Sequence, residues 1–574
     1  MRSSQGKSPP ARGDVIAREP PWSMRQIGWR HGRQWFVTPD FVGAQSMRWS
    51  LTQLGLVAFS VCLPTLITAS EPLHRVIDRY IGDAAGGPVA PQASDAEFLR
   101  RVTLDLAGRV PTVEETRAFL GNKGATKRTE VVESLLASPD YARRMQEFVS
   151  VWVLERRNET SIPQPDWIRY LEESLAADRP WNQIVGELMF VPAKEPKYPA
   201  AAKFMLVSGR KGNAHQITQD VARLFLGRDI MCAQCHDHPS VESYTQRDYF
   251  GLYSYVQEKP SQARSEFESV FEPGQQSTGP RLPGRPEREV PEVKPAEEDD
   301  AAAYRPRLML SEDLPHPENR LFVRTCVNRF WYLMMGRGLI HPLAADHPEN
   351  PPSHPELLEA LQAGWVADAL RIKPLLRQIA LSDAYQRAGT WSGLAEGETV
   401  HEDRYRVAIP KPLSPEQLAW SLLVATGNRE RMEQTPPSEP KFNWYDYING
   451  RSELLPANTA ETLDLFGRVL GAPEGENQDE FNPAMGHALF LMHEPLVLDW
   501  LEARPGTTME RVLAAKDASA QIQEIYLSIL SREPGDQEQR EALAYLRANQ
   551  ETQAGALVDL VWALLAAAEF RLNH

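Results

Sequence analysis

The chain has 574 residues, 42% of them hydrophobic, and a net charge of −15 at pH 7. This length is enough for two or more globular domains. The negative charge argues against nucleic acid as a partner, because proteins that bind nucleic acid present basic surfaces to its phosphates. The four cysteines are too few for the disulfide framework of a small secreted protein: Cys62, Cys232, Cys235 and Cys326.

The first 70 residues contain a candidate export signal. Residues 47–70 combine a basic start at Arg48, an apolar run over 51–69 and small residues at its end, which is the pattern of a secretory signal peptide. An uncleaved membrane anchor and a buried helix are the alternatives. We therefore expect an exported protein, periplasmic or at the cell surface, which contacts a membrane only if residues 51–69 are retained. Residues 1–46 are expected to be disordered or to precede the true start of translation.

Helix signals dominate residues 71–256, which we expect to form an N-terminal helical domain. Two Ser/Thr-x-x-Glu capping boxes each precede an apolar run that ends at a glycine, and they predict helices over 94–108 and 112–121. Apolar residues at helical spacing predict further helices over 127–157, interrupted at Ser138-Pro139, and over 166–177, 181–189 and 216–227. A short strand is expected at Lys203–Val207.

The sequence Cys232-Ala233-Gln234-Cys235-His236 follows the last of these helices in a loop. C-x-x-C-H is the pattern of covalent c-type haem attachment. The thiols of Cys232 and Cys235 can each add to a haem vinyl group, and His236 is then placed to bind the iron. Two alternatives remain open: a Cys232–Cys235 disulfide, and a metal site that uses Cys232, Cys235, His236 and His238.

A sixth haem ligand is not identifiable from the sequence. Met205, His215 and Met231 are candidates only because they are near the motif in the chain. An aromatic stretch follows the motif and contains Tyr249, Phe250, Tyr253 and Tyr255. These residues are expected in the protein core, with a role as a cover for a haem edge as the alternative.

Residues 257–307 differ in composition from the rest of the chain, because Pro, Glu, Gly and Arg dominate them. We expect a flexible linker there, followed by a C-terminal helical domain over 308–574. Helix-start patterns recur in this second half, at Ser353 with Glu356 and at Ser414 with Gln417. The predicted fold class is therefore mainly α, with two helical domains and little β structure.

Other polar groups give weaker functional signals. A loop with three histidines and two acids could bind a metal, although such loops are more often capped and solvated; it contains His341, His347, His354, Asp346 and Glu349. His487 and His493 are expected in core or capping roles, and Cys326 is expected to be a buried thiol. The chain contains none of the glycine-rich phosphate-binding, nucleophile-elbow or H-E-x-x-H motifs, and no catalytic set can be identified.

Longer motifs connect these observations. Those of the first half are Leu104–Thr112, Phe225–Gly227, Cys232–Pro239 and Thr245–Tyr253, and those of the second half are Val327–Trp331, Gly336–Leu339, Pro351–Leu358 and Glu569–His574. Together they resemble a planctomycete cytochrome-c-associated family in which a DUF1549 domain is followed by a DUF1553 domain. The resemblance implies an exported protein without an established activity, and it places the cytochrome-like motif at Cys232, Cys235 and His236.

Three functions are compatible with these features. The first is electron transfer or redox sensing by one covalent haem c, held by Cys232, Cys235 and His236. With a single C-x-x-C-H motif, the chain is then expected to need a redox partner or a cytochrome c. The second is a structural or carbohydrate-associated cell-surface role, with a Cys232–Cys235 disulfide. The third is a metal-dependent enzyme that uses Cys232, Cys235 and His238.

Overall fold

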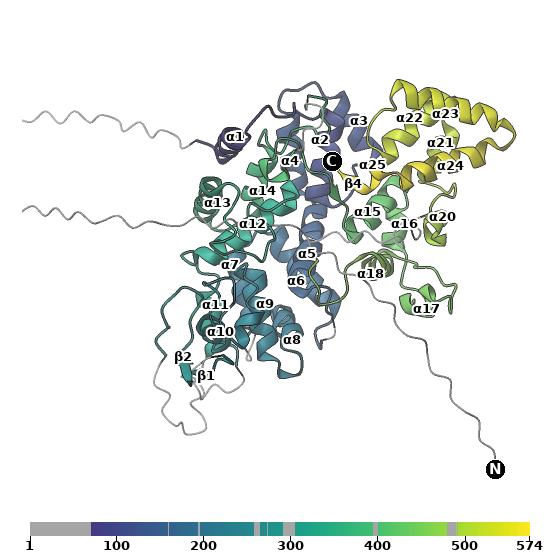
Figure 1. The fold of residues 1–574 in the computed structure, drawn as a ribbon. Coiled ribbons are helices and arrows are strands. Elements are labelled where there is room, and N and C mark those ends of the chain that lie inside the picture. Colours follow the sequence, from purple (N-terminus) through teal and green to yellow (C-terminus); the bar gives the residue numbers. More distant parts are fainter. Residues whose placement is uncertain are drawn as a thin grey trace, which may run out of the picture. The chain divides into compact units, whose positions relative to one another are not determined.

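The computed structural model describes residues 71–574 apart from 159, 193–195, 258–263, 272–273, 291–304, 394–399, 479–489 and 491. The candidate export signal and His487 therefore lie outside the described residues. Over the described part, the fold is mainly α, as predicted, with 24 helices and two small two-stranded sheets (Figure 1). No described helix is both long and apolar enough to cross a membrane.

A first hydrophobic core is built by the helices that precede residue 405. These are α1 (Leu73–Ala84), α2 (Asp95–Ala107), α3 (Val113–Gly121), α4 (Lys127–Ala137), α5 (Pro139–Leu154), α6 (Gln164–Ala176), α7 (Trp181–Met189), α8 (Lys203–Ser208), α9 (Ala214–Phe225), α10 (Gln246–Tyr253), α11 (Pro306–Asp313), α12 (Arg320–Met335), α13 (Pro355–Ala367) and α14 (Ile372–Ala380), with the short 3₁₀ helices η1 (Pro199–Ala202), η2 (Arg210–Gly212), η3 (Met231–Gln234) and η4 (Glu402–Arg404). Within this core, Trp152 stacks on Trp181 at 5.2 Å, and Phe330 meets the edge of Trp152 at 5.9 Å.

Cys326 is fully buried beside them and accepts a hydrogen bond from Trp181, and burial raises the pKa of its thiol to about 12. It is thus the buried thiol that we expected.

A second core is built by the helices that follow residue 413, together with Leu104 and Val110. These are α15 (Pro415–Thr426), α16 (Arg429–Gln434), α17 (Trp444–Ile448), α18 (Thr459–Leu470), α20 (Pro495–Asp499), α21 (Thr508–Ala514), α22 (Ala518–Ile529), α23 (Asp536–Ala548), α24 (Gln553–Ala566) and α25 (Ala568–Arg571), with η5 (Gln550–Thr552). Buried residues up to Tyr405 thus belong mostly to the first core, and those from Leu413 onward belong to the second. The expected linker at 257–307 does not separate the two cores. The reason is that the apolar faces of α11–α14 pack against α1–α10. Such contacts between distant segments cannot be predicted from local composition.

The expected linker is in part an ordered β-hairpin. β1 (Ser265–Phe267) pairs antiparallel with β2 (Gln276–Thr278). The Phe267 ring stacks on Phe250 of α10 at 4.9 Å, and Leu282 is only 2% exposed. A few apolar residues within a polar segment are thus enough to attach it to the first core.

Local helix signals were confirmed where both halves of a capping box are satisfied. Thr112 and Glu115 exchange side-chain to backbone hydrogen bonds at the start of α3, and Ser414 and Gln417 do so at the start of α15. Ser138 caps α5, which separates it from α4 as predicted.

Three local predictions were wrong. Ser94 caps α2, but the Glu97 carboxylate binds Arg101 instead of closing the box. The pattern at Ser353 does not form a box either, because α13 begins after His354 without a side-chain cap. Lys203–Val207 is helical, as part of α8, because its apolar residues pack on the helices around them rather than on a sheet.

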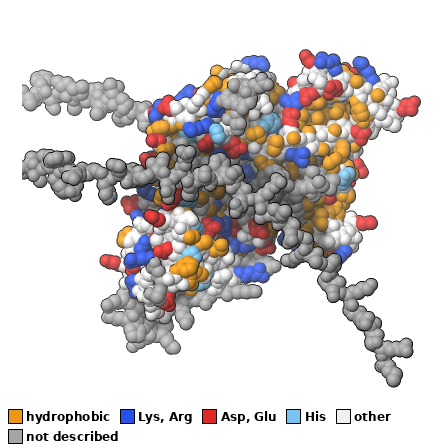
Figure 2. All heavy atoms as spheres, in the orientation of Figure 1, with side chains coloured by type: hydrophobic (Ala, Val, Ile, Leu, Met, Phe, Trp, Pro, Cys, Tyr) orange, Lys and Arg blue, Asp and Glu red, His pale blue; other side chains and the backbone are white. Residues whose placement is uncertain are grey.

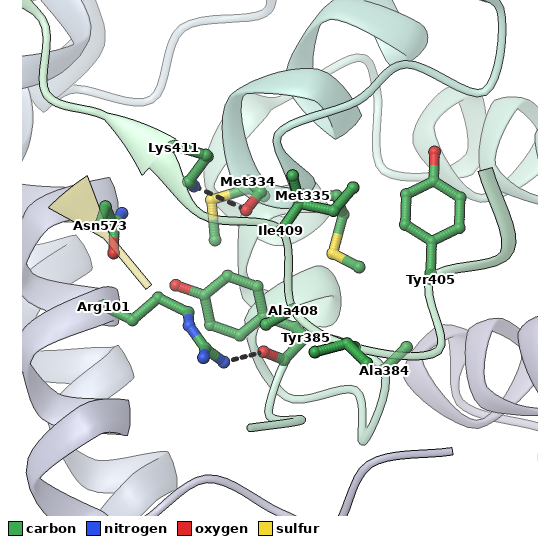
Figure 3. A pocket seen from close by; sticks show the side chains of 11 residues that line it. Arg101, Met334, Met335, Ala384, Tyr385, Tyr405, Ala408, Ile409, Lys411 and Asn573 are labelled. Carbon is green, nitrogen blue, oxygen red and sulfur yellow. Dashed lines mark hydrogen bonds between the residues drawn. The ribbon is translucent and has the colours of Figure 1, made fainter. Parts of the chain in front are cut away.

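The two cores meet at a buried polar contact around Asp105 of α2. Its carboxylate accepts hydrogen bonds from the Lys411 ammonium at 2.5 Å, the Asn573 amide at 2.7 Å and the Tyr385 hydroxyl at 2.8 Å. Lys411 and Asn573 lie on β3 (Lys411–Pro412) and β4 (Leu572–Asn573), which pair with each other. Figure 3 shows Lys411, Asn573 and Tyr385 around a cavity of about 10 Å³. The C-terminus is thereby fixed to the first core.

Candidate functional site

The C-x-x-C-H motif follows α9, and Gly227 directs the chain out of that helix. Gly227 has a φ of +65°, and a Cβ atom there would lie 2.8 Å from the Thr325 hydroxyl. Its carbonyl accepts a hydrogen bond from the Asp346 amide at 2.9 Å, and Arg228 pairs with Ala345. The motif is thus held between α9 and a loop of the second half of the chain.

Replacement of Gly227 by alanine is expected to lower the free energy of unfolding by about 2 kcal/mol, because both the backbone conformation and the space at Thr325 oppose a side chain. Gly86 is the matched control, since it has a φ of +69° but no neighbouring atom within 4 Å. Urea unfolding of both variants measures the difference. An equal loss in Gly227→Ala and Gly86→Ala would show that the contact with Thr325 contributes nothing.

The two cysteines of the motif lie in one tight turn. Met231–Gln234 form the 3₁₀ helix η3, and the Cys235 amide donates to the Cys232 carbonyl at 3.3 Å. This bond closes one tight turn over Cys232–Cys235, in which the two cysteines are three residues apart and Cys235 directly follows η3. Both cysteines are exposed and neither forms a disulfide in this structure.

His236 is oriented by the backbone of the next residue, Asp237. Its Nδ1 atom lies 2.7 Å from the Asp237 carbonyl oxygen, which can only accept, so Nδ1 carries the proton. The Nε2 atom is therefore left with a lone pair, the state in which a histidine binds a metal. The Phe271 ring, from the loop after β1, lies 4.9 Å from the imidazole ring.

His238 is engaged differently. Its Nδ1 atom accepts hydrogen bonds from the amides of Ser240 at 3.2 Å and Val241 at 3.1 Å, which places the proton on Nε2. Neither nitrogen then offers a lone pair to a metal. The His238 ring meets the edge of Tyr244 at 5.7 Å, and His347 meets Tyr244 at the same distance.

The histidine-rich loop of the second half forms separate pairs. His347 lies 3.0 Å from the Glu349 carboxylate, and Asp346 pairs with Arg324 at 3.0 Å, while burial raises the Asp346 pKa. His354 is buried against Tyr405, a residue of the first core. Within the described ranges, no three His, Cys, Asp or Glu side chains converge in a way that could hold a metal ion.

The three candidates for a sixth haem ligand have different surroundings. His215 shares a hydrogen bond of 2.9 Å with the Tyr249 hydroxyl and stacks on Tyr253 at 4.6 Å, and burial lowers its pKa. Met205 is only 8% exposed within the core, whereas Met231 is 57% exposed on η3. Of these, Met231 alone lies on the turn itself.

The aromatic stretch after the motif belongs to the core, as expected. Tyr249 and Tyr255 are buried, and burial raises the Tyr249 pKa well above its usual range. In contrast, His493 is exposed rather than part of the core. No local pattern pointed to Val270 and Phe271, which reach the motif from the expected linker; the Val270 amide donates to the Cys235 carbonyl at 3.1 Å.

Two family models match the chain. Residues 74–260 match PSCyt2, described as a protein of unknown function (DUF1549), and residues 306–546 match PSD1, described as a protein of unknown function (DUF1553). The first match contains the C-x-x-C-H turn, and the second contains the loop that holds it. No curated protein and no solved structure matches the chain.

Proposed function

The chain belongs to the family that joins a DUF1549 domain to a DUF1553 domain, and from its own residues we propose that it holds one covalent c-type haem for electron transfer or redox sensing. Cys232 and Cys235 would be the thioether anchors, and His236 the proximal ligand. The supporting observation is the geometry of the turn: two exposed cysteines share one tight turn, and the histidine that follows them has its Nδ1 atom 2.7 Å from the Asp237 carbonyl oxygen. We also propose export, because c-type haem is attached outside the cytoplasm.

The residues of the turn fit the chemistry of this group. A bound haem supplies a one-electron couple, whose potential depends on the axial ligands and on exposure to solvent. The hydrogen bond from His236 Nδ1 to the Asp237 carbonyl orients the ring and increases the basicity of Nε2. The exposure of both thiols favours electron exchange with a partner at the protein surface.

The alternatives have less support from the side chains. A metal-dependent enzyme would need Cys232, Cys235 and His238 as ligands. The Nδ1 atom of His238 already accepts two backbone hydrogen bonds, and its Nε2 atom then carries the proton. A structural or carbohydrate-associated cell-surface protein would need a Cys232–Cys235 disulfide, and the two thiols are separate in this structure.

The test is expression of the full chain in a host with the c-type maturation machinery, followed by a haem stain and a pyridine haemochrome spectrum. The wild type is expected to carry one covalent haem per chain. Cys232→Ala/Cys235→Ala is expected to lose it, while Cys326→Ala, which removes the buried thiol, should retain it.

Absence of haem from the wild type, while a control cytochrome matures in the same cells, would rule the proposal out. Two thiols that react only after reduction would then favour the disulfide. Zinc in a near-stoichiometric amount would favour the metal enzyme.

A further inference from the structure

An exposed apolar patch surrounds the C-x-x-C-H turn. Met231 is 57% exposed, Val270 is 66% exposed and Phe271 is 74% exposed. Val270 is bonded to the Cys235 backbone and Phe271 contacts His236, so the patch adjoins the turn directly. Hydrophobic and histidine side chains gather on this face, over α10 and the β1–β2 hairpin (Figure 2). Exposed apolar patches of this kind are typical of interaction sites.

The rim of the patch is acidic. Residues 229–246 contain no lysine or arginine, and their three acidic residues are all exposed: Asp229, Asp237 and Glu242. The segment on the other side of the patch adds exposed Glu266 and Glu268. The Gln246 amide holds the two segments together, because it donates to the carbonyls of Gln234 and Glu268, each at 3.4 Å.

Three arginines near this rim have other partners. Arg228 lies half-buried over the ring of Tyr244, at 5.5 Å. Arg247 and Arg264 both pair with Glu287. The face thus combines an apolar centre with a negative periphery.

We infer that this face, defined by Met231, Val270, Phe271 and the acidic rim, is the docking face for a redox protein whose own exposed prosthetic group is ringed by basic side chains. That the partner is a redox protein rests on the proposed haem, whereas its basic charge follows from the rim. Opposite charges steer such an encounter and fix its orientation, and the apolar centre brings the two groups into contact. Interfaces of this class are small and transient, and salt weakens them.

The test uses immobilised mitochondrial cytochrome c, a basic redox protein, as the probe, with binding of the full chain followed by surface plasmon resonance. Binding by the wild type is expected at about 20 mM NaCl and to weaken at least about tenfold at about 200 mM. Glu242→Lys/Glu266→Lys is expected to weaken binding by a further factor of about ten, because it reverses two charges of the rim. Phe271→Ser is expected to weaken binding about fivefold, through the apolar centre.

Matched controls change the same residue types on the second core. Glu453→Lys/Glu551→Lys and Leu513→Ser alter exposed side chains there and are expected to change binding less than about twofold. Unchanged binding in both the charge-reversal and the Phe271→Ser variants, or no binding by the wild type at low salt, would overturn the inference.

The haem-free Cys232→Ala/Cys235→Ala variant is measured alongside, so that this inference and the proposed function fail separately. A wild type without haem whose binding still shows the expected dependence on salt and charge would support the docking face and contradict the proposed haem. A wild type that carries haem but lacks that dependence would support the proposed haem and contradict the docking face.

Discussion

Replacing Asp105 with alanine is expected to lower the free energy of unfolding by about 4 kcal/mol, the largest loss of stability that we expect from a single substitution in this chain. The carboxylate is 2% exposed and is shared by Lys411, Asn573 and Tyr385. Its removal leaves the mostly buried Lys411 ammonium without a counter-charge. It also leaves the polar groups of Asn573 and Tyr385 without their acceptor.

Urea unfolding at neutral pH measures this loss, and Asp105→Asn separates its two causes. The asparagine keeps an acceptor oxygen but no charge, so an intermediate loss is expected. Asp83→Ala removes an exposed carboxylate of α1 and is expected to change stability by less than about 0.5 kcal/mol. A loss below about 1 kcal/mol in Asp105→Ala would show that Lys411 finds other partners; its ammonium already donates to the carbonyls of Leu333 and Met334.

The second large effect concerns Asp140, at the start of α5, which joins the two cores through arginines. It binds Arg109 at 2.6 Å and Arg429 of α16 at 2.7 Å. Burial alone would raise the pKa of this carboxyl, but Arg429, Arg109 and Arg143 outweigh it and hold the pKa well below its usual 3.8. We expect Asp140→Asn to lower the free energy of unfolding by about 2 kcal/mol at neutral pH, a value reduced for the partial exposure of Arg429.

The direction of the pH dependence follows from the lowered pKa. Above pH 3.8 the carboxylate is charged in both the folded and the unfolded chain, and its stabilising contribution is complete. As the pH falls below that value, the unfolded chain takes up a proton that the folded protein does not, and the contribution is lost. Urea unfolding of the wild type and of Asp140→Asn from neutral pH down to about pH 3 should therefore show converging stabilities. Parallel curves would contradict a role for this carboxylate in acid unfolding.

The ends of many helices could be predicted from sequence because they depend on neighbouring residues. Thr112 with Glu115, and Ser414 with Gln417, satisfy each other locally, so the pattern alone is sufficient. Glu97 shows the limit of such local patterns. Its carboxylate binds Arg101, one turn further along the helix, instead of the backbone amide of Ser94, and only the folded structure shows which contact forms.

The candidate site could be predicted in its centre but not in its surroundings. Cys232, Cys235 and His236 lie within five residues of one another in the chain, so the spacing alone is enough to propose them as a candidate site. Phe271 and the Thr325 contact of Gly227 come from segments 35 and more residues away, and no period or composition links them to the motif. For the same reason, composition marks the polar segment between the two family matches but does not show which apolar faces meet.

The division of the cores affects how this chain could be inherited. α12 and α13 belong to the DUF1553 match, yet they bring Phe330 and Trp365 into one aromatic cluster with Trp152 of the DUF1549 match. A gene rearrangement that cut between the two matches would leave both fragments with an open apolar face. The two segments are matched as separate families, but each is needed to complete the first core, so they would have to pass between genomes as a pair.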